Sequence, residues 1–245
     1  MDKNLLSRLQ KQIEWKSAVK VLLPAVLLVW VWQRGFAVIP LISFVAALGW
    51  GYFTESQERK QFRTSFWLTA LTTLVGLYML SGSTALPIAL ITLFAVAVAV
   101  ELSFFRFLFT NRSAVYGIYH LALIFATFLI FFASSLQWLS LIYAVLAITL
   151  VLQEYFTLEG AHHRMRVVLL SVGTGFLVSE VALLTRTLPL GTVNAAAFMA
   201  LITLLTRDAI KAHFEGKLSL ASVLRGIAIF LFVSVIIFGL SMWRV

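Results

Sequence analysis

The chain has 245 residues, of which 61% are hydrophobic and 12% are charged, and its net charge is +9. A soluble domain is typically about 45–50% apolar and about 25% charged, so this composition excludes an ordinary soluble domain. Cysteine is absent, which excludes disulfide bonds, a thiol nucleophile and a cysteine-based metal site. The basic residues are spread over short connections between apolar segments, a pattern that reports membrane topology and argues against a nucleic-acid partner.

Two uncharged runs are the strongest signal in the sequence. Residues 64–100 and 113–153 contain no Asp, Glu, Lys or Arg over 37 and 41 positions. About 20 apolar residues, rising 1.5 Å each, cross a hydrocarbon core of about 30 Å, so each run is long enough for two crossings. The apolar stretches are continuous and do not alternate as barrel strands would. The sequence therefore predicts an all-α, polytopic transmembrane helix bundle.

The elements follow in chain order. Residues 1–16 place Leu5, Leu9 and Ile13 on one helical stripe, which predicts an amphipathic helix lying in the head-group region; the alternative is a plain continuation of the first span. Residues 17–245 are expected to form a single transmembrane domain. About nine spans are predicted, or eight if the first is interfacial: 17–33, 36–53, 64–81, 84–103, 113–133, 136–153, 167–185, 188–206 and 224–243.

Two local features accompany the later spans. Pro189 is expected near the first turn of the eighth span, where a helix tolerates proline. Ser171 and Gly175 have the spacing of small residues at a helix–helix contact.

The distribution of basic residues predicts the orientation. With the N-terminus in the cytoplasm, 16 of the 19 Lys and Arg residues fall on the cytoplasmic side, as expected for short loops between membrane spans. With nine spans the C-terminus lies outside. The expected location is a plasma membrane or a bacterial inner membrane, and the expected surroundings are the lipid bilayer.

Glu180 is the most informative single residue, because it lies inside the seventh span, about five residues from its outer end. Acidic residues within spans are costly and are functional candidates by default. Asn194 lies at a similar depth on the next span, and Arg186 follows the end of the seventh. The sequence leaves two interpretations open: an outward polar pocket for a cation, a proton or a polar head group, or an interhelical bond that fixes the packing of the two spans.

His120 lies in the fifth span, about seven residues from its cytoplasmic end. It is either a member of a proton relay or a neutral histidine hydrogen-bonded within the bundle. His162 and His163 form the only adjacent histidine pair, but their spacing is not that of a metal motif. The sequence therefore predicts neither a metal site nor a cofactor.

Acidic residues stand near the cytoplasmic ends of four spans: Glu55, Glu101, Glu154 and Asp208. An acid at a helix C-terminus opposes the helix dipole, so either these residues form a ring at the cytoplasmic mouth or the helices continue past the membrane. In the second case Asp208 is expected to pair with Lys211, and Glu55 with Arg59, one helical turn away.

These patterns favour a non-catalytic subunit or scaffold of a membrane complex, with a protein partner or a homo-oligomer within the membrane. The first alternative is a small-solute or ion permease using the Glu180 and Asn194 pocket. The second is a membrane-embedded enzyme, which would require Glu101, His120, Glu154 and Arg225 to converge. No catalytic residue is assigned from the sequence.

Overall fold

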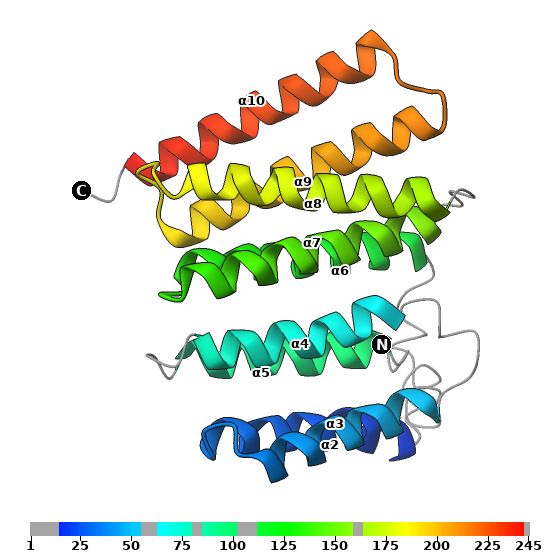
Figure 1. The fold of residues 1–245 in the computed structure, drawn as a ribbon, viewed down its shortest axis with the longest axis vertical. Helices are drawn as coiled ribbons and strands as arrows, with labels where there is room; N and C mark the ends of the chain where they lie inside the picture. The colour runs from blue at the N-terminus through cyan, green and yellow to red at the C-terminus, as the bar shows by residue number, and fades with distance from the viewer. Residues whose placement is uncertain (1–14, 55–62, 80–84, 102–111, 159–163, 243–245) are drawn as a thin grey trace, which may run out of the picture. The chain divides into compact units, whose positions relative to one another are not determined.

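The computed structural model describes residues 15–54, 63–79, 85–101, 112–158 and 164–242, and every regular element within these ranges is an α-helix (Figure 1). The predicted all-α class is therefore confirmed. The helices are α2 (Trp15–Gln33), α3 (Val38–Phe53), α4 (Arg63–Met79), α5 (Ala85–Glu101), α6 (Arg112–Ala133), α7 (Gln137–Leu158), α8 (Arg164–Thr185), α9 (Thr192–Phe214) and α10 (Leu220–Met242). The expected amphipathic segment lies outside the described residues, apart from its last two positions in α2.

Each predicted span coincides with one observed helix, with differences at the ends. Helices α7 and α9 continue to Leu158 and Phe214, well beyond the predicted ends at 153 and 206. Pro189 was expected inside the eighth span, but it lies in the loop before α9. Three of the described helices, α7, α8 and α9, are long and apolar enough to cross a membrane.

The N-terminal unit, residues 1–115, contains α2 to α5. Helix α2 packs against α3 and α5, and α4 packs against α5. Aromatic rings fill the contacts: Phe44 of α3 lies 5.6 Å from Phe94 of α5, and Tyr52 of α3 lies 4.7 Å from Phe66 of α4, measured between ring centroids. Aromatic pairs at such separations add to the stabilisation from apolar burial.

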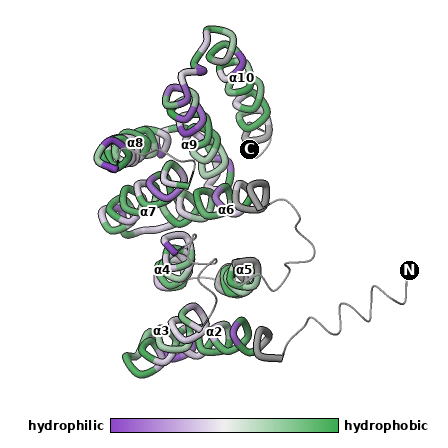
Figure 2. The backbone as a smooth tube through the Cα atoms, turned by 90° about the vertical axis from the view of Figure 1, so that its right-hand side faces the viewer, coloured by the Kyte–Doolittle hydropathy of each residue, from purple (hydrophilic) through white to green (hydrophobic). Residues whose placement is uncertain are grey.

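The C-terminal unit, residues 116–245, contains α6 to α10. Helix α8 packs against α7 and α9, and α9 packs against α10. The ring of Phe198 in α9 lies 5.8 Å from Phe230 and 5.7 Å from Phe238, which fastens α10 to α9. Hydrophobic residues make up much of the helices in this unit (Figure 2), and many large apolar side chains of α7, α8 and α10 are exposed.

Helices α7 and α8 approach each other closely at Gly175. A Cβ atom at this position would collide with Oγ1 of Thr149 and would lie 3.1 Å from the carbonyl oxygen of Val145. Ser171, one turn earlier on the same face, is fully buried. The small-residue packing that the sequence predicted at Ser171 and Gly175 is thus confirmed.

Two glycines of α8 provide a matched test of this contact. Gly175→Ala should lower the free energy of unfolding by about 1–3 kcal/mol, because the added methyl group overpacks the α7 interface. Gly173→Ala should leave stability unchanged or raise it by up to about 1 kcal/mol, since alanine favours helix and a Cβ there meets no atom within 4 Å. Unfolding in detergent micelles measures both variants, and equal stabilities would contradict the close contact.

Candidate functional site

Three helices of the C-terminal unit bring ionisable side chains together. His120 of α6 is fully buried, and its Nε2 lies 4.0 Å from Oε2 of Glu154 in α7, whose side chain is only 6% exposed. Arg207 of α9 is 12% exposed and acts electrostatically on His120. We call these three residues the α6–α7–α9 cluster. In an apolar interior, such groups are costly unless they compensate one another.

Tyr155 links the cluster to a second cation. Its ring lies under the Arg207 guanidinium, 4.3 Å from Cζ to the ring centroid, and 5.9 Å from Nζ of Lys211. The His120 ring lies 5.9 Å from the same centroid. Cation–π contacts of this kind hold an arginine that has left bulk water, so Tyr155 positions Arg207 beside the His120–Glu154 pair.

Arg207 also binds the neighbouring Asp208, with Nη2 2.8 Å from Oδ1. Its Nη1 is buried and has no hydrogen-bond acceptor among the described residues. The prediction that Asp208 pairs with Lys211 is wrong: Lys211 lies 3.8 Å from Glu215, one turn further along α9. Glu215 in turn accepts a hydrogen bond from Lys217, which lowers the pKa of the Glu215 carboxyl.

The cluster can do two things chemically. A carboxylate facing an imidazole in a nearly dry environment can hold and exchange a proton. The same contacts also tie α6, α7 and α9 together, because separating the helices would leave ionisable groups buried without compensation. His120 and Glu154 were predicted separately, and the structure brings them together.

A double-mutant cycle measures the His120–Glu154 interaction. We expect His120→Asn and Glu154→Gln each to destabilise the protein, and the double variant to lose less than the sum of the two. The coupling free energy should be about 0.5–3 kcal/mol, as found for residues in one polar network. A matched cycle between His120→Asn and Glu215→Gln should give no coupling, and a zero value for the first cycle would remove the pair from the site.

The described contacts do not join the three residues predicted for the outer side, Glu180, Asn194 and Arg186, into one site. Glu180 is exposed on α8 and Asn194 is half-buried on α9. Neither side chain forms a hydrogen bond or an ion pair within the part of the chain that the structure describes. The described contacts therefore do not assemble a polar pocket from Glu180 and Asn194.

Arg186 fastens the end of α8 to the α6–α7 hairpin. Its Nη2 donates to the carbonyl oxygen of Phe131 and, at 3.4 Å, to Oγ of Ser140. Its guanidinium lies 4.2 Å from the centroid of the Phe131 ring. Partial burial lowers the pKa of Arg186, but a guanidinium keeps its proton in proteins. The Arg186 side chain therefore holds the end of α8 against the α6–α7 hairpin, and it does not bind Glu180.

Three other predicted residues remain, from the cytoplasmic ends of the spans. Glu55 and the side chain of Glu101 lie outside the described residues, and Arg225 is exposed on α10. Of the four residues whose convergence an enzyme would require, the structure brings together His120 and Glu154. Among the residues it describes, no three His, Asp or Glu side chains are placed to hold a metal ion.

Arg207 and Tyr155 are the residues that sequence reasoning missed. Both were assigned to connections because the spans were ended at 153 and 206, whereas α7 and α9 continue through them. The helical spacing of Arg207, Lys211 and Glu215 along one face was the available signal for a longer α9.

Comparison with known proteins gives no match: no protein-family model, no curated protein and no solved structure is similar enough to this chain to place it in a family. The class that the fold defines is an all-helical protein with membrane-compatible helices.

Proposed function

We propose that this chain is a polytopic membrane protein, crossing the bilayer nine times, and a non-catalytic component of a membrane complex. The outward faces of its helices support the bilayer placement. Phe232 and Val235 of α10 are 69% and 71% exposed, and similar apolar side chains cover the outer surfaces of α7 and α8. Soluble proteins rarely leave contiguous apolar patches larger than a few hundred Å² in water, whereas lipid tails solvate them.

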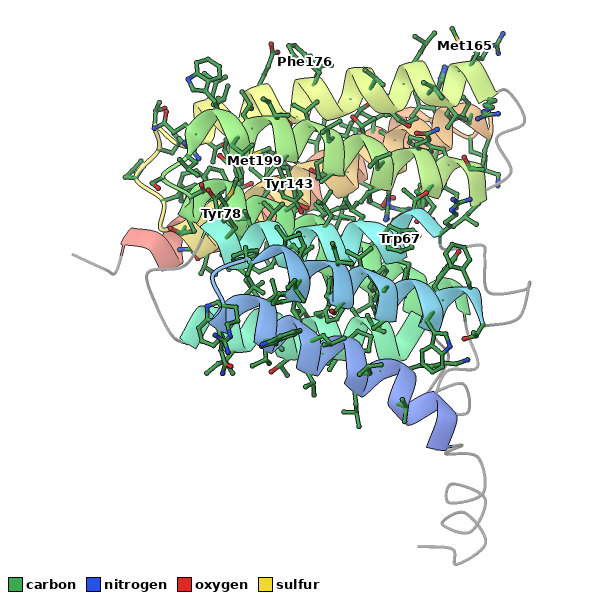
Figure 3. All side chains as sticks on the ribbon, turned by 60° about the horizontal axis from the view of Figure 1, so that its bottom comes forward. Trp67, Tyr78, Tyr143, Met165, Phe176 and Met199 are labelled. Carbon is green, nitrogen blue, oxygen red and sulfur yellow. The ribbon has the colours of Figure 1, made fainter. Side chains whose placement is uncertain are left out.

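The exposure of Glu180 is the observation that supports a role within a membrane complex. Glu180 is exposed on α8, about four turns beyond Arg166 and among exposed apolar neighbours such as Phe176 and Leu184. Figure 3 shows Phe176 and Met165 projecting from α8 away from the neighbouring helices of the unit. Lipid tails offer no hydrogen-bond donor, so a carboxyl group on this face calls for a polar group from another polypeptide.

The size of the particle tests this proposal. In mild detergent or nanodiscs, the wild-type protein should elute as an assembly larger than one 27.4 kDa chain. Glu180→Leu should weaken that assembly about 3- to 30-fold, which corresponds to the ~0.6–2 kcal/mol of a polar contact between membrane helices, while the folded yield is kept. Glu215→Leu, an exposed acid in the α9–α10 loop, is the matched control.

Two results would count against the complex. One is a wild-type particle with the mass of a single chain in both media. The other is an assembly of unchanged affinity in the Glu180→Leu variant. Extraction of the protein from membranes without detergent would remove the bilayer placement itself.

A proton- or ion-coupled permease is the second candidate, and the His120–Glu154 pair favours it. Buried ionisable residues within membrane helices commonly mark proton pathways. The pair stands near the predicted cytoplasmic end of the unit, with Arg207 beside it to bias its charge.

Proton flux discriminates the permease from the subunit. In sealed vesicles containing a pH-sensitive dye, a permease should collapse an imposed pH gradient faster than protein-free vesicles do. Glu154→Gln should bring that rate to the protein-free level, because an amide cannot exchange the proton, while Glu180→Leu should leave it unchanged. Wild-type vesicles no faster than empty ones would eliminate this candidate.

A further inference from the structure

Basic side chains gather at one end of the C-terminal unit, where α7 and α9 end and α8 and α10 begin (Figure 1). The basic side chains that the structure describes at this end are Arg164, Arg166, Arg207, Lys211, Lys217 and Arg225, and the acidic ones are Glu154, Asp208 and Glu215. Six positive and three negative charges leave an excess of three positive charges. The predicted topology places this end in the cytoplasm.

The acidic residues of α9 and of the loop after it pair with the cations of the same segment. Arg207 binds Asp208, with Nη2 2.8 Å from Oδ1. The Glu215 carboxylate lies 3.8 Å from Nζ of Lys211 and 2.8 Å from Nζ of Lys217. The cations of this segment therefore have carboxylate partners, and the excess charge belongs to α8 and α10.

Three arginines of α8 and α10 carry that excess. Arg164 and Arg166 begin α8, Arg225 stands in the second turn of α10, and all three are exposed. None of them forms a hydrogen bond or an ion pair within the described part of the chain. The α8 arginines also stand at a helix N-terminus, where the helix dipole disfavours positive charge. The fold itself thus gives these three guanidinium groups no compensating charge.

Exposed apolar side chains flank each of these arginines. Met165 and Leu169 of α8 are 70% and 60% exposed, and Leu224 and Ile227, on either side of Arg225, are 56% and 49% exposed. Figure 3 shows Met165 projecting away from the neighbouring helices. Arginine at the edge of a lipid-facing surface lays its aliphatic stem along the tails and extends its charge into the head groups. The ligand of these cations is therefore a molecule with an anionic group at head-group depth.

The residue type favours a phosphate. All three unpaired cations are arginines, whereas two of the three paired ones, Lys211 and Lys217, are lysines. A guanidinium donates two parallel N–H bonds to a phosphate group, while an ammonium acts as a point charge. The cytoplasmic leaflet of membranes is rich in anionic phospholipids, whose field attracts basic residues next to membrane spans.

We infer that Arg164, Arg166 and Arg225 bind the phosphate groups of anionic phospholipids in the cytoplasmic leaflet. This inference rests on the bilayer placement in the proposed function and goes beyond it by naming a lipid class. Each guanidinium donates N–H bonds to phosphate oxygens, and the apolar side chains beside it contact the first methylene groups of the tails.

Lipid titration tests the inference. The full chain in detergent micelles receives phosphatidylglycerol or phosphatidylcholine with identical tails, and bound lipid is counted by native mass spectrometry. Phosphatidylglycerol should bind more tightly and raise the thermal midpoint of unfolding, as expected for a ligand of the folded state. The double variant Arg164→Gln/Arg166→Gln should weaken phosphatidylglycerol binding about 5- to 30-fold, and Arg225→Gln about 5-fold.

Two variants separate phosphate recognition from net charge. Lys217→Gln removes one positive charge from the same end, but this cation is already paired with Glu215, so it should change lipid binding by less than about twofold. Arg164→Lys/Arg166→Lys keeps the charge and loses the paired N–H donors, so its affinity should fall between those of the wild type and the glutamine variant. Soluble glycerol phosphate, which has no tails, should bind more weakly than phosphatidylglycerol.

Four results would overturn the inference. Wild-type protein that binds both lipids equally would remove the preference for anionic lipid. An equal loss in Lys217→Gln would reduce it to net charge, and glycerol phosphate as tight as phosphatidylglycerol would indicate a soluble anion. A co-purifying acidic polypeptide that the glutamine double variant loses, with lipid binding unchanged, would assign the arginines to a protein. All four leave the Glu180-dependent complex intact, whereas a single-chain particle that still prefers phosphatidylglycerol would overturn the complex alone.

Discussion

The backbone of α8 passes so close to α7 at Gly175 that a single methyl group would collide with Thr149 and with the carbonyl oxygen of Val145. This close packing orients both helices. It turns the small-residue face of α8 inward, and because side chains of a helix point in all directions about its axis, the opposite face, with Glu180, is turned outward. It also holds α7 where Glu154 and Tyr155 meet residues from α6 and α9.

The polar side chains of the C-terminal unit are accommodated in two different ways. His120, Glu154 and Arg207 come from three helices and compensate one another inside the unit, with the Tyr155 ring supporting the guanidinium. Arg186 donates hydrogen bonds from Nη2 to the α6–α7 hairpin. Glu180 is different, because it is exposed on α8 and bonds to none of the described residues. The first group of residues stabilises the packing of the helices, whereas Glu180 is available for contact with another molecule.

The proposed function follows from that contrast. Apolar outer surfaces on several helices suit a lipid environment, and a carboxyl group placed within such a surface suits contact with another protein. The α6–α7–α9 cluster is compatible with proton exchange. Because its residues come from three helices, a change in the charge of the cluster would alter the contacts of all three.

The sequence by itself determined the helical class, the approximate position of each helix and the small-residue contact at Gly175, because apolar length and small-residue spacing are local properties of the chain. It also identified Glu180, His120 and Glu154 as unusual, since charged or titratable residues stand out within apolar runs. Only the tertiary structure decided which of them meet. Glu154 joins His120 because α7 continues beyond its predicted end and turns that side chain inward, and Arg186 binds the α6–α7 hairpin and leaves Glu180 exposed. The direction of a side chain about its helix axis depends on which neighbours the helix packs against, and those neighbours are fixed by contacts between residues far apart in the chain.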